Sequence, residues 1–432
     1  MKRIVGVLML IAVLVPVPAA ASAKSAPAAG RYIVLLRPGL SGPSAVAMAD
    51  SLGAKVYMRY GAAVDGYAAA LSSSAVETLR ADPSVLMVSP DGVVHATTTQ
   101  FPQFVTAGIR RIRGDRSGTV SGNGHGRVPI NVAVLDTGIQ PDHPDLNVVG
   151  GHSCFASPSY ADRNGHGTLV AGFIGAKDNK IGVVGVAPGA NLYAVRVLNR
   201  NGRGSDSQVI CGIDWVTSTR EDADPTNDIA VANMSLGGTG SDDHDCGLKN
   251  NDAMHFAICQ SVAAGVTYVV SAGNDATDIR HVTPAAYDEV LTTAAIADYN
   301  GLPGGGAPFY SNCGAPDLGR DDHAAAFSNF ATSSADAAHM IAAPGVCITS
   351  TYIGSQYALD TGTSFSSPIV AGTVALCIWD GRCTGAPQQI MSTFLRDTRR
   401  HDRAHPGYGF VGNTLHRRQG RSYGYLDDAG IF

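Results

Sequence analysis

Apolar and polar positions alternate along this chain in a way that predicts strands and helices in turn. Short runs rich in valine, isoleucine and alanine predict buried strands, which occupy residues 130–135, 191–198, 229–234 and 266–270. The segments that follow or separate them predict helices at residues 169–174, 208–217, 251–264 and 369–378. Strands that alternate with helices are typical of a mainly parallel sheet covered by helices on both faces. From about residue 100 to residue 432, the pattern therefore predicts an α/β fold.

A smaller unit precedes this region, at about residues 31–95. Its pattern predicts strands at 32–36, 66–71 and 85–88, and helices at 44–52 and 74–81. A β-α-β-β-α-β-like order of this kind suits a small ferredoxin-like α+β domain.

The first 23 residues have the layout of a secretory signal peptide. Lys2 and Arg3 precede an apolar stretch at residues 4–15, and small residues follow at 20–23. A membrane anchor is the less favoured alternative, because the apolar run is short and ends in prolines. We therefore expect cleavage after Ala23 and export of the protein, with no membrane segment in the mature form.

Four short motifs in the larger region supply the side chains that nucleophilic acyl transfer requires. Asp136 lies in the segment VLDTG, His166 in NGHGT, Asn274 in VSAGN and Ser364 in GTSFSSP. A serine hydroxyl is a weak nucleophile at neutral pH, so a base such as His166 must take its proton. Asp136 would orient that imidazole, and the side-chain N–H of Asn274 would stabilise the oxyanion. Pro368 is expected in the first turn of the helix after Ser364, where a missing N–H costs little.

These motifs, in the order aspartate, histidine and serine, resemble those of the subtilases, the subtilisin-like serine peptidases of family S8. The resemblance covers about residues 130–376 and is closest in character to secreted proteinase-K-like and bacterial extracellular members. It implies a subtilisin-like three-layer sandwich. It also implies a serine endopeptidase with Asp136, His166 and Ser364 as its triad and Asn274 as oxyanion donor. Phe365 departs from the family, which most often has methionine after the nucleophile.

Residues 66–91 of the smaller unit resemble the inhibitor propeptide of subtilases. After the predicted signal peptide at 1–23, the resemblance gives a propeptide at 24–99 and a catalytic domain at 100–432. It implies that the propeptide assists folding, inhibits the enzyme as an intramolecular partner and is then removed by the enzyme itself. The linker at residues 93–100 would be the cleavage region. A permanent accessory domain is the alternative.

By the same resemblance, two edge segments hold a substrate peptide between them as an added strand. They are Gly202-Arg203-Gly204 and Ser235-Leu236-Gly237. Leu236, Gly237, Ala272 and Gly273 would line the pocket for the residue before the scissile bond. Because these residues are small or apolar, we expect a broad preference for apolar or aromatic residues at that position.

The chain contains eight cysteines, and an even number in an exported protein predicts disulfides. Pairing of nearest neighbours is our hypothesis among many connectivities. It gives the bridges Cys154–Cys211, Cys246–Cys259, Cys313–Cys347 and Cys377–Cys383. A zinc site built from cysteines is less favoured, because no CxxC pair occurs.

The resemblance suggests a structural calcium ion but no cofactor for catalysis. Asp145 and Asn179 fall where many subtilases bind calcium, and oxygen ligands would suit that ion. Lys177 and Lys180 bring positive charge to the same loop, so a plain surface loop stays the alternative.

Composition agrees with an exported enzyme that acts on peptides. Hydrophobic residues make up 45% of the 432 positions, which is ample for a packed core. The net charge of −5 is too mild to favour binding to nucleic acid or to an anionic membrane. We expect a monomer whose partners are peptide and protein substrates. The alternative is a catalytically silent subtilase relative that binds peptides in the same cleft, and peptide turnover that Ser364→Ala abolishes would distinguish the two.

Overall fold

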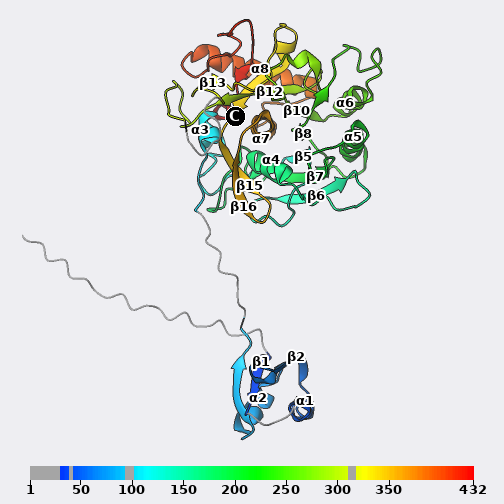
Figure 1. The fold of residues 1–432 in the computed structure, drawn as a ribbon, viewed down its shortest axis with the longest axis vertical. Coiled ribbons are helices and arrows are strands. Elements are labelled where there is room, and N and C mark those ends of the chain that lie inside the picture. Colours follow the sequence, from blue (N-terminus) through cyan, green and yellow to red (C-terminus); the bar gives the residue numbers. More distant parts are fainter. Residues whose placement is uncertain (1–29, 38–41, 93–101, 310–317) are drawn as a thin grey trace, which may run out of the picture. The chain divides into compact units, whose positions relative to one another are not determined.

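The protein is described by a computed structural model that covers residues 30–37, 42–92, 102–309 and 318–432. The chain divides into two compact units, Met1–Thr99 and Gln100–Phe432, and each is described by itself (Figure 1). The predicted signal peptide and the whole predicted cleavage linker, residues 93–100, lie outside the described residues. Within the described part, no helix is both long enough and apolar enough to span a membrane.

The N-terminal unit is a four-stranded antiparallel sheet with two helices. Its elements follow one another as β1 (Arg31–Leu36), α1 (Gly42–Ser51), β2 (Lys55–Gly61), β3 (Asp65–Ala70), α2 (Ser73–Ala81) and β4 (Val85–Pro90). The strand order β2-β3-β1-β4 is that of a ferredoxin-like βαββαβ unit, as the sequence predicts. The apolar pattern does not reveal β2, because this edge strand is largely exposed and carries charged residues.

The C-terminal unit is built on a sheet that has nine strands among the described residues. Eight of them pair in parallel, in the order β17-β14-β12-β10-β8-β5-β7-β6, and β13 pairs with β12 in the antiparallel sense. Their bounds are β5 (Asn131–Asp136), β6 (Val148–Ser153), β7 (Asn191–Arg196), β8 (Val231–Met234), β10 (Thr267–Ser271), β12 (Leu291–Ala297), β13 (His323–Ala324), β14 (Met340–Pro344) and β17 (Tyr425–Leu426). The predicted α/β fold with a mainly parallel sheet is confirmed.

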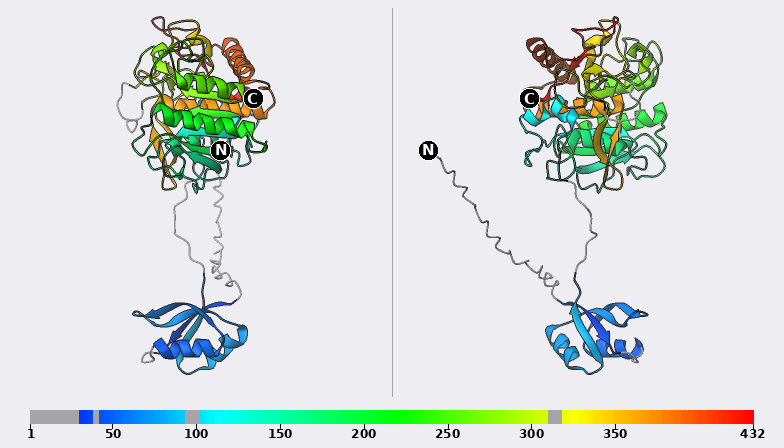
Figure 2. Two further views of the ribbon diagram at one scale, coloured as in Figure 1. Left: turned by 90° about the vertical axis from the view of Figure 1, so that its right-hand side faces the viewer. Right: turned by 60° about the vertical axis from the view of Figure 1, so that its left-hand side comes forward.

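Helices cover both faces of this sheet and make it the middle of three layers (Figures 1 and 2). The main ones are α4 (His166–Gly175), α5 (Asp206–Glu221), α6 (Ala253–Ala263), α7 (Thr363–Trp379) and α8 (Pro387–Ala404). Successive side chains of a strand point to opposite faces. Accordingly, Val132 and Val134 of β5 pack in one core cluster with α4 and α7, whereas Ala133 and Leu135 pack in another with α5 and α6.

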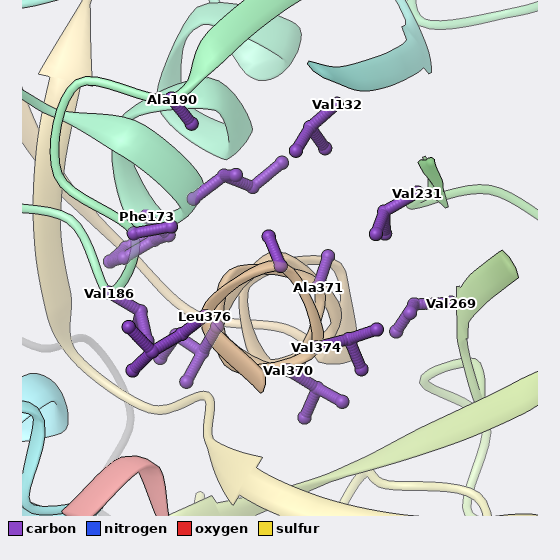
Figure 3. Packing of buried hydrophobic residues seen from close by; sticks show 14 of the residues in the cluster. Val132, Phe173, Val186, Ala190, Val231, Val269, Val370, Ala371, Val374 and Leu376 are labelled. Atoms are coloured by element: carbon purple, nitrogen blue, oxygen red, sulfur yellow. The ribbon is translucent and has the colours of Figure 1, made fainter. Parts of the chain in front are cut away.

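Helix α7 is largely buried in the first cluster, and the expected nucleophile is its second residue. Figure 3 shows Val370, Ala371 and Val374 of α7 packed near Val231 and Val269 of the sheet. The helix lies close to its neighbours: a Cβ at Gly372 would come within 2.8 Å of Val186 Cβ. Because packing fixes α7 so tightly, the position of its first turn is also well defined.

The remaining elements are short and complete the unit around this core. They are α3 (Ala107–Arg111), the paired strands β9 (Gly238–Thr239) and β11 (Val282–Thr283), the hairpin of β15 (Ile348–Tyr352) and β16 (Gln356–Asp360), and 3₁₀ turns at Gly114–Arg116, Ile279–His281, Asp336–His339 and Ala429–Ile431. Disulfides join Cys154 to Cys211, Cys246 to Cys259 and Cys377 to Cys383, which are three of the pairs expected from the sequence. The fourth expected pair includes Cys313, which lies outside the described residues.

Candidate active site

The fold brings Asp136 and His166 together at the carboxyl edge of the sheet. Asp136 ends β5 and His166 begins α4. The Nδ1 atom of His166 lies 2.8 and 2.9 Å from the two carboxylate oxygens of Asp136. An ionised carboxylate only accepts hydrogen bonds, so Nδ1 carries the proton and Nε2 is left with its lone pair. Burial alone would lower the pKa of His166, but the adjacent Asp136 outweighs it and the pKa lies above its usual value.

The loop before His166 is held by Asp162, a residue that the sequence motifs do not single out. One carboxylate oxygen of Asp162 accepts hydrogen bonds from the backbone of Asn164 and Gly165 and from the Thr137 hydroxyl. The other accepts from the backbone and the hydroxyl of Thr168. Asp162 therefore joins the end of β5 to the start of α4, and it fixes the position of the His166 backbone.

Gly165 has to be glycine for two reasons. Its φ of 111° is a left-handed conformation that side chains rarely adopt. In addition, a Cβ there would lie 2.1 Å from the ring of Tyr352. The close passage of Tyr352 behind the loop lets its hydroxyl donate to the Asn164 carbonyl at 3.2 Å. The glycine in the histidine motif therefore serves both the turn and the packing behind it.

Ser364 occupies the second position of α7, and Pro368 occupies the sixth. The sequence predicts Pro368 in the first turn of this helix, and that prediction is wrong: the proline lies in the second turn. A proline has no N–H to donate to the carbonyl four residues before it, which here is that of Ser364. The hydroxyl of Ser235 donates to this carbonyl at 2.7 Å instead. A side chain of the neighbouring edge segment thus replaces a helix hydrogen bond at the expected nucleophile.

Ser235 is itself held by buried polar groups. The side-chain amide of Asn233 donates to the Ser235 hydroxyl at 3.0 Å, and the Ser367 hydroxyl donates to the Asn233 carbonyl oxygen at 2.8 Å. Asn233 is fully buried, so these bonds satisfy groups that water does not reach. The hydroxyl of Ser364 lies 3.5 Å from the backbone oxygen of Ser235. The segment after β8 and the first turns of α7 therefore form one hydrogen-bonded unit.

Asn274 lies beside the start of α7 with its amide held in one orientation. Its Oδ1 accepts hydrogen bonds from the backbone N–H and the hydroxyl of Thr363, both at 2.9 Å. The Nδ2 atom lies 3.5 Å from where a Cβ on Gly362 would be. The carbonyl end of the amide is thus engaged, and no hydrogen bond of Nδ2 occurs among the described residues.

The loop that carries Asn274 is fixed by Asn329, which the sequence reasoning misses. Asn329 Oδ1 accepts from the backbone of Asp275 and Thr277, and its Nδ2 donates to the Ala272 carbonyl. A Cβ at Gly273 would lie 2.4 Å from Asn329 Nδ2, and the φ of Gly273 is 101°. No local motif marks Asn329, because its role depends on a contact between distant parts of the chain.

A cleft of about 1000 Å³ runs past His166. Both expected edge segments line it, with all of Gly202, Arg203, Gly204, Ser235, Leu236 and Gly237 at its walls. The loop at residues 238–241 and 250–254 forms a further wall. Ala272 and Gly273 are not among the lining residues, and Ala272 is fully buried under the Asn274 loop.

The two expected calcium ligands lie next to each other and are joined by a hydrogen bond. Asp145 is fully buried, and its carboxylate accepts from the amide of Asn179 at 3.0 Å, the backbone of Val183 at 3.1 Å and the hydroxyl of Tyr357 at 3.2 Å. The Oδ1 of Asn179 accepts from the backbone of Ile181. Burial raises the pKa of Asp145 to about 6. Calcium prefers oxygen ligands, and its binding by Asp145 and Asn179 stays a prediction.

Comparison with known proteins assigns each of the two units to the family that its sequence resembles. The model of the subtilase family matches residues 129–420, and that of the peptidase inhibitor I9 family matches residues 31–97. Subtilisin E of Bacillus subtilis is 35% identical over 83% of this chain and 84% of its own. A thermostable alkaline protease of Halalkalibacterium halodurans is 37% identical over 71% of each chain. The crystal structure of a cold adapted subtilisin-like serine proteinase matches 75% of this chain and 97% of its own, with 26% identity and a TM-score of 0.53.

Proposed function

Because this chain belongs to the subtilase family of serine peptidases and carries an I9 inhibitor unit, we propose that it is a secreted endopeptidase made as a self-processing zymogen. The observation that carries the proposal is the hydrogen bond from His166 to Asp136 at the edge of the sheet. Ser364 lies in the first turn of α7, where Asn274 accepts a hydrogen bond from Thr363 and the ring of Phe365 lies 5.5 Å from that of His166. This arrangement supports acyl transfer with a side-chain oxyanion donor.

In the proposed reaction, the Ser364 hydroxyl attacks the carbonyl carbon of the scissile peptide bond. His166 takes the serine proton on Nε2, and Asp136 stabilises the imidazolium that forms. Asn274 Nδ2 donates to the oxygen that gains negative charge, and the backbone N–H of Ser364 adds a second donor. The imidazolium then gives its proton to the departing amine, and water enters by the same route to release the acyl group. No metal or cofactor takes part in these steps.

Substrate would bind as an extended strand between the segments 202–204 and 235–237. Backbone hydrogen bonds of this kind give affinity with little side-chain selectivity. We propose a broad preference for apolar or aromatic residues before the scissile bond. Support comes from Leu198, Leu236 and Met254, which give the cleft apolar surface. Arg203, Asp206 and Asp252 also line the cleft and would affect residues further from the bond.

The zymogen proposal also assigns the rest of the chain. Residues 1–23 would direct export, and residues 24–99 would be the propeptide that inhibits the enzyme within the same molecule. The match of residues 31–97 to a peptidase inhibitor family supports this assignment. Cleavage in the linker would release a monomeric enzyme that begins near Gln100.

The test compares the full-length chain with its Ser364→Ala variant. Both are purified after export, and intact mass and N-terminal sequencing locate their first residues. We expect the parent chain to lose its residues up to about 96–100, whereas the variant keeps its propeptide. Casein hydrolysis should appear only in the parent chain. If neither protein is cut and neither hydrolyses casein, the chain is a silent relative, and peptide binding in the cleft becomes the property to measure.

A further inference from the structure

A cluster of acidic and histidine side chains lies beside the cleft and takes no part in the proposed reaction. Its centre is His255 of α6, whose side chain is fully buried and stacks on the ring of Tyr287 with centroids 4.0 Å apart. The Nε2 atom of His255 lies 2.8 Å from a carboxylate oxygen of Glu289. Since an ionised carboxylate can only accept, Nε2 carries the proton and donates it. The Nδ1 atom of a neutral ring then presents its lone pair.

That lone pair faces two further carboxylates. Nδ1 of His255 lies 3.7 Å from Asp242 Oδ1 and 3.6 Å from Asp243 Oδ1. These separations are too long for a hydrogen bond, which spans roughly 2.7–3.2 Å. Nδ1 is buried and has no hydrogen-bond partner within the described structure. A lone pair aimed at two nearly buried carboxylate oxygens is repulsive unless a cation lies between them.

The separations match those of ligands around one metal ion. Two ligand atoms held about 2.0–2.2 Å from a tetrahedral zinc ion lie about 3.4 Å apart. We propose that Asp242, Asp243 and His255 bind a divalent transition-metal cation, and that Zn²⁺ is the ion this ligand set suits best. Glu289 acts behind the site, because a carboxylate on the far ring nitrogen orients a histidine ligand and raises its basicity.

The acidic ligands are held in place by the loop that carries them. The oxygens of Asp243 accept backbone hydrogen bonds from Asp245, Gly247, Lys249 and Asn250. Burial alone would raise the pKa of Asp243, but these bonds hold it well below its usual range and keep the ligand ionised. The disulfide Cys246–Cys259 joins the same loop to α6. The facing oxygens also accept backbone hydrogen bonds, Asp243 Oδ1 from Asp245 and Gly247 and Asp242 Oδ1 from His244, so within the described structure only His255 Nδ1 has no partner.

The proposed ion would also act on the substrate cleft. Ser241 and Asn250 at the two ends of this loop line the cleft wall, as does Asp252 at the start of α6. An ion that joins the loop to His255 would therefore restrict the motion of one wall. A second group, Asp242, His244 and Asp288, lies nearby, but His244 is 64% exposed and already contacts Asp288 at 2.8 Å. His244 therefore serves as the internal control in the binding experiment below.

A proton on Nδ1 is the competing occupant. Burial alone would lower the pKa of His255, but Glu289, Asp242 and Asp243 outweigh it and the pKa lies above its usual value. Metal binding requires the unprotonated nitrogen, so the two compete. Zinc affinity should therefore fall as the pH is lowered.

The test uses the full-length Ser364→Ala chain, so that the protein does not digest itself. The chain is treated with a chelator, dialysed and titrated with Zn²⁺ by calorimetry, and with Co²⁺ by visible absorption. We expect one ion per chain and a higher unfolding temperature with Zn²⁺. His255→Gln should abolish binding, and Glu289→Gln should weaken it about 10–100-fold. His244→Gln should leave it unchanged.

Three results would overturn the proposal. They are the absence of binding at millimolar Zn²⁺ in a chain with a folded circular dichroism spectrum, binding that survives His255→Gln, and binding that His244→Gln removes. If His255→Gln does not fold, Asp242→Asn replaces it, and unchanged affinity in that variant also rejects the site. Because the readout is ion binding, its failure leaves the peptidase proposal untouched.

Discussion

The contact between Ser235 and the Ser364 carbonyl leads to a prediction that couples two distant residues. Ser235→Ala removes the side-chain donor of this carbonyl, to which Pro368 has no N–H to offer. It also leaves the Asn233 amide without its acceptor. Ser235 is only 4% exposed, so water does not readily replace either bond. With about 1–3 kcal/mol for each of the two buried groups left unpaired, we expect a loss of about 2–6 kcal/mol in the free energy of unfolding.

Pro368→Ala supplies the missing backbone N–H and should relieve part of that loss. In the Pro368→Ala background, Ser235→Ala should therefore cost about 1–2 kcal/mol less than in the parent chain, because the carbonyl is paired. The assay is urea unfolding of the four full-length chains, each carrying Ser364→Ala to prevent digestion. Ser392→Ala is the matched control, since its exposed hydroxyl bonds only within its own helix. Equal costs in both backgrounds, within about 0.5 kcal/mol, would refute the reasoning.

Three further predictions concern the proposed catalytic groups. Asp136→Asn should lower kcat about 10⁴-fold with little change in KM, because the imidazole would adopt the wrong tautomer; steady-state kinetics on a peptide substrate measures this. Asn274→Ala should lower kcat about 10²–10³-fold in the same assay, and an unchanged kcat would reject its role as oxyanion donor. Catalysis needs neutral His166, and Asp136 raises the pKa of His166, so kcat/KM should fall as the pH drops through a value above 6.5. A pH profile that stays flat down to pH 5 would contradict that assignment.

The sequence predicts the layers of the larger unit well because its central strands are continuous apolar runs. Residues 130–135 and 266–270 correspond to β5 and β10, each displaced by one residue. Two other central strands, β12 and β14, are not predicted. Both are rich in alanine, which has little preference for strands, and only their parallel pairing with neighbours defines them.

The candidate site also contains residues that the sequence predicts and residues that it does not. Local motifs identify the residues proposed to react, because each follows a recognisable strand or begins a helix. Two of the residues that hold them, Asn329 and Ser235, act through contacts with distant segments, and Asp162 adds a bond from Thr137 to its local bonds. A single sequence does not encode such contacts locally, and Ser235 was expected only to line the cleft. The displacement of Pro368 to the second turn has the same origin, since the first residue of α7 is set by packing.

The measurement that tests the central claim most directly is labelling of the processed protein with a serine-directed fluorophosphonate, followed by peptide mapping. The account predicts one label per molecule, on Ser364, and no label after His166→Ala. A label on another serine, or peptide hydrolysis that continues while Ser364 stays unmodified, would contradict it.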